Sequence, residues 1–381
     1  MYYAINQNGE KQSLYHLKPD ELHRIKSELF HCPNCHEQLL VRSGPKVSPH
    51  FAHFPRSDCA LQKGESVLHE KGKWDLYQWI RSQGYKVELE AYLKDIQQRP
   101  DVLLHMNGKR VAFEYQCATI ATKEVEKRNK AYLRAGIFPL WVLGVNQLRK
   151  QNLHQISMNN FLRSFLYFFH NHFHLYFYDP ECEEMIILTD LQFVETSSIA
   201  GDFHNQPLAS LTFPQLFSFR NPSNKYPLSH SWERLLYNHR TKYRANVGSE
   251  ERQFRQYLYL KGHHFSLIPS ICYLPVRSQL SVETKPYIWQ TRLIMDHFLN
   301  KSIGQSGWFP RVVNHSTVNE YQADVAQEYV DLLDALGVLK KVNDHEWVKK
   351  KDVAFHQTMK NALEEDKTMV KQLKNLQRIH I

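Results

Sequence analysis

The chain has 381 residues, of which 42% are hydrophobic and 13% aromatic, and its formal net charge is +9. This composition excludes a disordered chain, and the length allows two or three domains. No apolar run approaches the roughly 18 residues of a membrane span, and the first residues lack the pattern of a signal peptide. We therefore expect a cytoplasmic protein that does not enter a membrane. The charge favours a polyanionic partner such as nucleic acid, although a generally basic surface would give the same sum.

The first predicted module is a cluster of cysteines and histidines. Cys32 and Cys35 form a Cys-x-x-Cys turn, and His50, His53 and Cys59 follow it. Such a short segment has too little core to fold without a staple, so we predict a structural zinc ion. The favoured ligands are Cys32, Cys35, His53 and Cys59, with His50 as the competitor for one position. A reduced thiol pair beside ordinary surface histidines is the alternative. The other cysteines stand alone and are predicted to be buried hydrophobes: Cys117, Cys182 and Cys272.

A helix is predicted from Glu65 to Ser82, because its apolar residues have helical spacing. Glu65, His69 and Lys73 recur every four residues and therefore share one stripe of that helix. Gly84 ends the helix, and alternating apolar residues predict a strand over 87–91.

The next segment predicts a β-hairpin with two opposed acids. Asn107-Gly108 between two apolar runs is a strong signal for a two-residue type I′ turn. Counting back from that turn places Asp101 opposite Glu114, with Gln116 on the same face. Two opposed anions favour a cation between them, so the register predicts a metal site. The alternative is a pair of solvated carboxylates, and a slip of one residue would separate them.

A second helix is predicted over 121–134 and a buried strand over 138–144. The resulting order is helix, three strands, helix and strand. This order predicts an α/β fold with a mixed sheet.

The order of these elements, with Pro100-Asp101 followed by Glu114-Tyr115-Gln116, resembles the core of the PD-(D/E)xK nuclease superfamily. The longer run resembles the competence protein CoiA family. The motifs that carry this resemblance are Cys32-x-x-Cys35, His50-Phe51-Ala52-His53, Glu65-Ser66-x-x-His69-x-x-x-Lys73, Asp101, Glu114 and Pro139-Leu140-Trp141-Val142-Leu143. The resemblance implies a restriction-endonuclease-like core. It also implies a role in natural transformation of bacteria, acting on incoming DNA and promoting recombination.

By this resemblance Asp101 and Glu114 would bind Mg²⁺ or Mn²⁺, and Glu65 would be the acid of the first helix. The superfamily's lysine falls on Gln116, which can orient a water but brings no charge. Lys73 could restore the cation, or it could be a surface lysine. The implied activity is metal-dependent hydrolysis of single-stranded or branched DNA, with recombination proteins as further partners. The alternatives are a non-catalytic DNA-binding mediator on a decayed nuclease fold and a restriction-type endonuclease.

We predict three domains: a zinc module over 1–63, a nuclease-like domain over 64–147 and a mainly helical domain over 148–381. Within the last domain, helices and a small basic hairpin over 288–351 predict a winged-helix-like module whose wing contacts phosphates. A helical domain with a terminal hairpin is the alternative. His170, His172 and His174 alternate in an aromatic run, which predicts a solvated strand face, with a metal site as the alternative.

Overall fold

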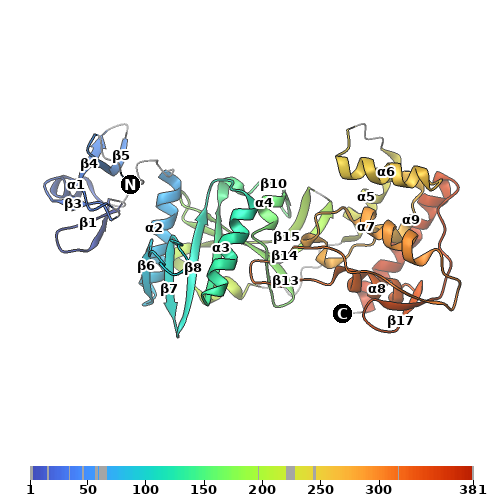
Figure 1. Cartoon of the computed structure of the whole chain (residues 1–381). Helices are drawn as coiled ribbons and strands as arrows, with labels where there is room; N and C mark the ends of the chain where they lie inside the picture. The colour runs from blue at the N-terminus through green and yellow to red at the C-terminus, as the bar shows by residue number, and fades with distance from the viewer. Residues whose placement is uncertain are drawn as a thin grey trace.

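The computed structural model describes residues 3–14, 17–33, 35–44, 47–55, 59, 67–195, 197–219, 228–242, 246–315 and 317–379. Figure 1 shows an elongated molecule in which the N-terminal strands, a central sheet and the C-terminal helices follow one another in chain order. None of the helices in this part of the chain combines the length and the apolar composition that a bilayer span requires.

The N-terminal part is an antiparallel sheet with one short helix. Its strands lie in the order β2-β1-β3-β4-β5, and buried side chains such as Phe30, Leu39 and Phe51 form a core of their own. The elements are β1 (Tyr3–Ile5), β2 (Lys11–Ser13), α1 (Pro19–Ile25), β3 (Phe30–His31), β4 (Gln38–Gly44) and β5 (Val47–His53).

The central part has the predicted order of helix, three strands, helix and strand. β6, β7 and β8 pair antiparallel, and β9 pairs parallel to β8. Trp79 of α2 packs against Phe113 on one face of the sheet, and Tyr132 of α3 packs with Leu103 and Ala112 on the other. The elements are α2 (Val67–Ser82), β6 (Lys86–Leu89), β7 (Val102–Met106), β8 (Lys109–Gln116), α3 (Thr122–Arg134) and β9 (Ile137–Gly144).

The hairpin between β7 and β8 has the predicted register. Met106 pairs with Lys109, and the pairing continues to Val102 and Phe113. Asn107 and Gly108 both have positive φ, 49° and 76°, as a type I′ turn requires. Asp101 and Glu114 are therefore the next opposed residues beyond the last ladder pair.

The sheet continues well past residue 147, where the sequence analysis places a domain boundary. It has ten strands, with the path β10-β11-β15-β14-β13-β9-β8-β7-β6 and β12 paired to β13. Neither the apolar runs of β13 and β14 nor the alternating histidines of β13 indicate which strands they pair with, so the sequence does not predict that they extend the sheet. The added elements are β10 (Lys150–Asn152), β11 (Gln155–Ser157), α4 (Asn160–Arg163), β12 (Tyr167–Phe169), β13 (His172–Asp179), β14 (Glu184–Glu195) and β15 (Ser198–Pro207).

The C-terminal part is more helical and has a separate core, which includes Trp289, Tyr329 and Trp347. A buried ion pair between Arg240 and Asp366, with Nη2 and Oδ1 2.7 Å apart, joins α5 to α9. The elements are α5 (Leu228–Thr241), α6 (Ser249–Leu260), α7 (Pro286–Leu293), a π-helical turn (Ile294–Phe298), β16 (Ser306–Trp308), α8 (Val325–Ala335), β17 (Leu339–Lys341), β18 (Glu346–Lys349) and α9 (Met359–Ile379).

The segment over 288–351 contains the helices and hairpin from which a winged-helix-like module was predicted. Its three strands lie in the order β16-β18-β17. The hairpin is not a plain basic surface, however, because Lys341 pairs with Asp331 at 2.8 Å and Lys340 with Asp334 at 3.5 Å. Both acids come from α8. A lysine that is paired with a carboxylate binds a phosphate less strongly, because the pair has no net charge. We therefore expect Lys340 and Lys341 to contribute little to DNA binding.

Two further expectations about single residues are wrong. Of the cysteines predicted to be buried, only Cys272 is; Cys117 is half-buried and Cys182 is exposed. The predicted solvated histidine face is also absent, because His174 is buried and His170 lies in the turn between β12 and β13 with a φ of 49°. The aromatic strands around His174 cover it, which the alternation of the histidines alone could not indicate.

Candidate functional site: a cysteine–histidine cluster and an acidic pair

Cys32, Cys35, His53 and Cys59 form a compact cluster in the N-terminal part. Their ligand atoms all lie within 4.8 Å of one another. The Sγ atoms of Cys32 and Cys59 are 3.8 Å apart, and Cys35 Sγ is 3.3 Å from His53 Nε2. Three thiols and one imidazole are a ligand set that zinc accepts at tetrahedral geometry. The cluster could therefore bind a structural zinc ion.

The fold explains why His53 and not His50 joins this cluster. Both histidines are in β5, where His53 pairs with Leu39 and His50 with Arg42. Residues three apart on a strand point to opposite faces, so only one of them can face the thiols. The ligand set that was favoured from the sequence is the one that the structure brings together.

Asp101 directly precedes β7, and a side chain of α2 lies close to its carboxylate. Its Oδ2 accepts a hydrogen bond from the backbone N–H of Tyr115 at 2.8 Å, and its Oδ1 is 3.8 Å from His69 Nε2. Burial alone would raise the pKa of Asp101. The nearby imidazole of His69, the charge of Lys73 and the hydrogen bond from Tyr115 outweigh burial and lower this pKa. Asp101 is therefore an anion at neutral pH.

Glu114 of β8 is the second acid, and side chains of α3 contact its carboxyl group. Its side chain is 3% exposed, and its Oε1 contacts the guanidinium of Arg128 and the hydroxyl of Tyr132. Burial and the neighbouring charge of Asp101 raise the pKa of Glu114 to about 8, although Arg128 acts in the opposite direction. These contacts come from α2 and β8 for Asp101 and from α3 for Glu114, so the shared metal site stays a prediction.

The other three residues that the sequence analysis assigned to this site are Lys73, Gln116 and Glu65, and their surroundings differ. Lys73 is not a surface lysine: its side chain is 2% exposed and its ammonium contacts Glu90. Gln116 donates from Nε2 to the carbonyl of Ala118 at 2.5 Å, a contact within its own loop. Glu65 lies outside the described residues. Among the residues that are described, the cysteine module is the only cluster of three or more metal-donor side chains, so the acidic pair alone is an incomplete metal site.

Three residues around the acids were missed from the sequence. Arg128 and Tyr132 are four residues apart on the predicted helix over 121–134, so helical spacing could have identified them as neighbours. Glu90 had no such signal. It meets Lys73 only because the loop after β6 folds back toward α2, which is a tertiary contact.

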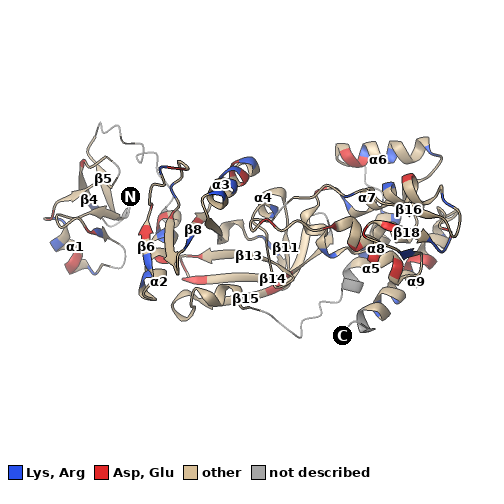
Figure 2. Cartoon of the chain, turned by 60° about the horizontal axis from the view of Figure 1, so that its bottom comes forward, with Lys and Arg blue, Asp and Glu red and all other residues tan. Residues whose placement is uncertain are grey.

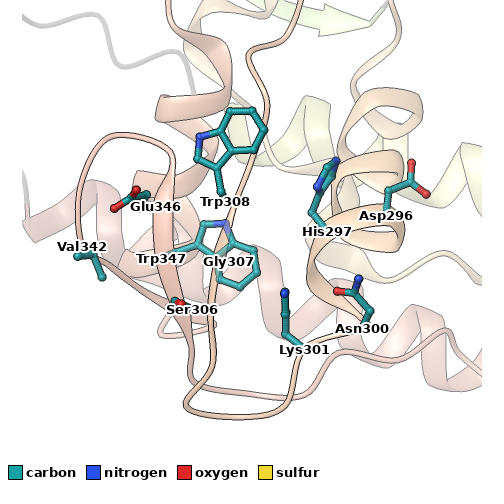
Figure 3. Close-up of a pocket in the computed structure, with 10 residues that line it drawn as sticks. All are labelled: Asp296, His297, Asn300, Lys301, Ser306, Gly307, Trp308, Val342, Glu346 and Trp347. Carbon is teal, nitrogen blue, oxygen red and sulfur yellow. The ribbon is translucent and has the colours of Figure 1, made fainter.

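The structure also contains a pocket of about 510 Å³ in the C-terminal part. Figure 3 shows Trp308 and His297 on different sides of this pocket, with Lys301 lower down. Its lining comes from the π-helical turn, β16 and β18, and includes neither Asp101 nor Glu114. The pocket is therefore separate from the acidic pair.

Comparisons with known proteins give one consistent result. The family models for the N-terminal, nuclease-like and C-terminal domains of competence protein CoiA match residues 14–62, 65–221 and 227–363. The chain is 26% identical over 368 residues to competence protein CoiA of Bacillus subtilis (strain 168), a match that covers 91% of this chain and 96% of the relative. No solved structure matches the chain significantly. Because all three domain models match in order along the sequence, the chain belongs to the competence protein CoiA family.

Proposed function

We propose that this protein is a metal-dependent deoxyribonuclease of bacterial competence, which acts on incoming DNA and promotes recombination during natural transformation. The observation that carries the proposal is the hydrogen bond from the backbone N–H of Tyr115 to Asp101 Oδ2 at 2.8 Å, which joins the Asp101 carboxylate to the residue after Glu114. The match to a nuclease-like domain supports the same class of chemistry. The B. subtilis relative is named as a competence protein, which supports the biological context.

The chemistry would divide among the residues of the pair. Two carboxylates suit Mg²⁺ or Mn²⁺, which prefer oxygen ligands, and a metal bound there would lower the pKa of a water and neutralise charge on the phosphate. Asp101 is already anionic. Glu114 has to release its proton and its contact with Arg128 before it can act as a ligand. Lys73 supplies the positive charge that Gln116 lacks.

The helix α3 supports a DNA-facing surface beside this site. In Figure 2 blue Lys and Arg positions recur along the ribbon of α3, and the exposed ones are Lys123, Lys127, Lys130 and Arg134. Arg128 on the same helix contacts Glu114. DNA phosphates that bind these side chains would release their condensed counterions. A DNA strand bound along α3 would then lie near Asp101 and Glu114. We propose single-stranded or branched DNA as the substrate.

A non-catalytic mediator is the second candidate. In this case the fold would bind DNA and recombination proteins without cleaving. Two observations favour it: Gln116 brings no charge where the nuclease superfamily has lysine, and Glu114 is held by Arg128 and Tyr132. A carboxyl held in this way stabilises the packing of α3 on β8 whether or not a metal binds.

Cleavage of single-stranded, duplex and branched DNA with Mg²⁺ or Mn²⁺ tests the two candidates. We expect the wild-type protein to cleave at least one substrate and Asp101→Ala to abolish cleavage, because a lone glutamate cannot hold the ion. Asp95→Ala is the matched control, since it removes an exposed acid from the loop before β7 and leaves the pair intact. No cleavage by the wild-type protein would favour the mediator, and full cleavage by Asp101→Ala would contradict the role of Asp101 in the proposed site.

A further inference from the structure

Two residues of the N-terminal part contact the central part directly. Tyr3 of β1 is 4% exposed. Its ring stacks on Trp74 of α2 with 6.5 Å between centroids, and its hydroxyl donates to Glu90 Oε2 at 2.6 Å. Lys11 of β2 donates from Nζ to the carbonyl of Leu89. The first two strands of the cysteine–histidine module therefore lie against the loop that follows β6.

Glu90 is held in an unusual position. Its φ is 52°, in the left-handed region that residues other than glycine rarely adopt. Its backbone N–H donates to the carbonyl of Asp101 at 3.0 Å. Such a conformation costs on the order of 1 kcal/mol and persists where surrounding contacts fix it. The loop therefore presents the Glu90 carboxylate in one direction, next to the residue that begins β7.

The Glu90 carboxylate joins the N-terminal module to the acidic pair. One oxygen accepts from Tyr3, and the other contacts the ammonium of Lys73. Lys73 in turn lies close enough to Asp101 for its charge to act on that carboxylate. The side-chain contacts therefore run from Tyr3 through Glu90 to Lys73, and the backbone hydrogen bond of Glu90 joins the same loop to Asp101. An interface that only joined two domains would not require the buried ammonium of Lys73 at this place.

We infer that Tyr3 and Glu90 are positioning residues, which fix the Lys73 ammonium beside Asp101, and that the N-terminal module thereby completes the nuclease-like site. The inference rests on the proposed function for its catalytic meaning. The fixed position of Lys73 can be tested without cleavage.

Acetylation of lysine side chains, followed by mass spectrometry of the full-length protein, tests the position of Lys73. We expect Tyr3→Phe to raise the labelling rate of Lys73 about two- to tenfold, the factor that corresponds to one hydrogen bond. Glu90→Gln should raise it at least as much, because it removes the ion pair. Lys71, two residues earlier on α2 and paired with Asp75 at 2.6 Å, is the internal control and should not change.

The control variant is Tyr85→Phe, which removes a hydroxyl from another tyrosine of the central part that packs on Phe213. It should leave Lys73 labelling at the wild-type rate. An unchanged Lys73 rate in both Tyr3→Phe and Glu90→Gln would overturn the inference. Equal rises at Lys71 and Lys73 would also overturn it, because they would indicate general loosening of α2.

Kinetics separate this inference from the proposed function. If the wild-type protein cleaves DNA, Tyr3→Phe should lower kcat about two- to tenfold and leave KM for DNA unchanged, because Tyr3 acts on the cation and not on the bound strand. A raised KM with unchanged kcat would assign Tyr3 to DNA binding and overturn its positioning role. If the wild-type protein does not cleave, the proposed function fails, and the labelling of Lys73 still decides whether Tyr3 and Glu90 hold it.

Discussion

Asp101 and Glu114 follow the last pair of the β7–β8 ladder, yet their surroundings shift their pKa values in opposite directions. Asp101 lies near the imidazole of His69 and accepts a hydrogen bond from the Tyr115 N–H, and both favour its anion. Glu114 is buried beside that anion, which favours its proton. Titratable neighbours whose pKa values move apart are typical of functional sites, although structural networks do the same. Because Asp101 is the anion of the two, we expect its substitution to have the larger effect on cleavage.

His174 makes stability depend on pH. Its side chain is buried and donates to the carbonyl of Phe169 at 3.4 Å. Burial lowers its pKa from 6.5 to about 4, so the unfolded chain binds a proton that the folded chain rejects between these two values. The free energy of unfolding should therefore fall as pH falls through this window, by about 3 kcal/mol from this residue.

His174→Phe should remove this contribution, because a neutral aromatic ring has no proton to gain. Urea denaturation at several pH values between 4 and 6.5 measures it. His154→Asn, a change at an exposed position, should keep the wild-type slope. An equally steep slope in His174→Phe would assign the pH dependence to other groups.

At the scale of elements, local signals predicted local geometry well. Asn107-Gly108 alone predicted the register of β7 and β8, because both residues accept positive φ and a two-residue turn leaves one pairing. The spacing of Cys32 and Cys35 predicted the cysteine–histidine cluster. The contact between Glu90 and Lys73 could not be predicted in this way. It depends on a loop that returns to a helix 17 residues earlier, and no periodic pattern describes such a return.

Two basic elements should differ in their contribution to DNA binding. Lys127 and Lys130 lie on the exposed side of α3, whereas Lys340 and Lys341 of β17 pair with acids of α8. Lys127→Ala/Lys130→Ala should weaken binding and reduce the salt slope of log K by about 2, one for each lost phosphate contact.

Lys340→Ala/Lys341→Ala is the matched double variant, with the same loss of charge, and should change that slope little. Fluorescence anisotropy with a labelled single strand, at several salt concentrations, measures both. A larger effect of the β17 pair would restore the winged-helix-like hairpin as the DNA contact.

At the scale of the whole molecule, we expect a zinc ion to stabilise the fold of the N-terminal part. Purified protein should contain about one zinc ion per chain, because four ligands close one tetrahedral site. Cys35→Ser should lower the zinc content and destabilise the N-terminal part, since metal binding and folding are coupled in small modules. Cys182→Ser, at an exposed cysteine outside the cluster, should retain the metal. Elemental analysis of both variants distinguishes them, and zinc-free protein with a folded module would contradict the assignment.

The pairing of β9 with β13 affects the order in which the molecule can fold. β8 and β9 pair on either side of α3 in the sequence. On the other edge of β9, Leu143 pairs with Phe177 of β13, and the hydroxyl of Tyr167 from β12 hydrogen-bonds to the backbone of Pro139 and Trp141. During synthesis at roughly 5–20 residues per second, β9 leaves the ribosome before β13 exists. Its apolar edge then stays open for seconds, and an open edge invites pairing with other chains. A fragment that ends at residue 147 would keep that edge open permanently, so it should aggregate where a fragment that includes β15 stays monomeric.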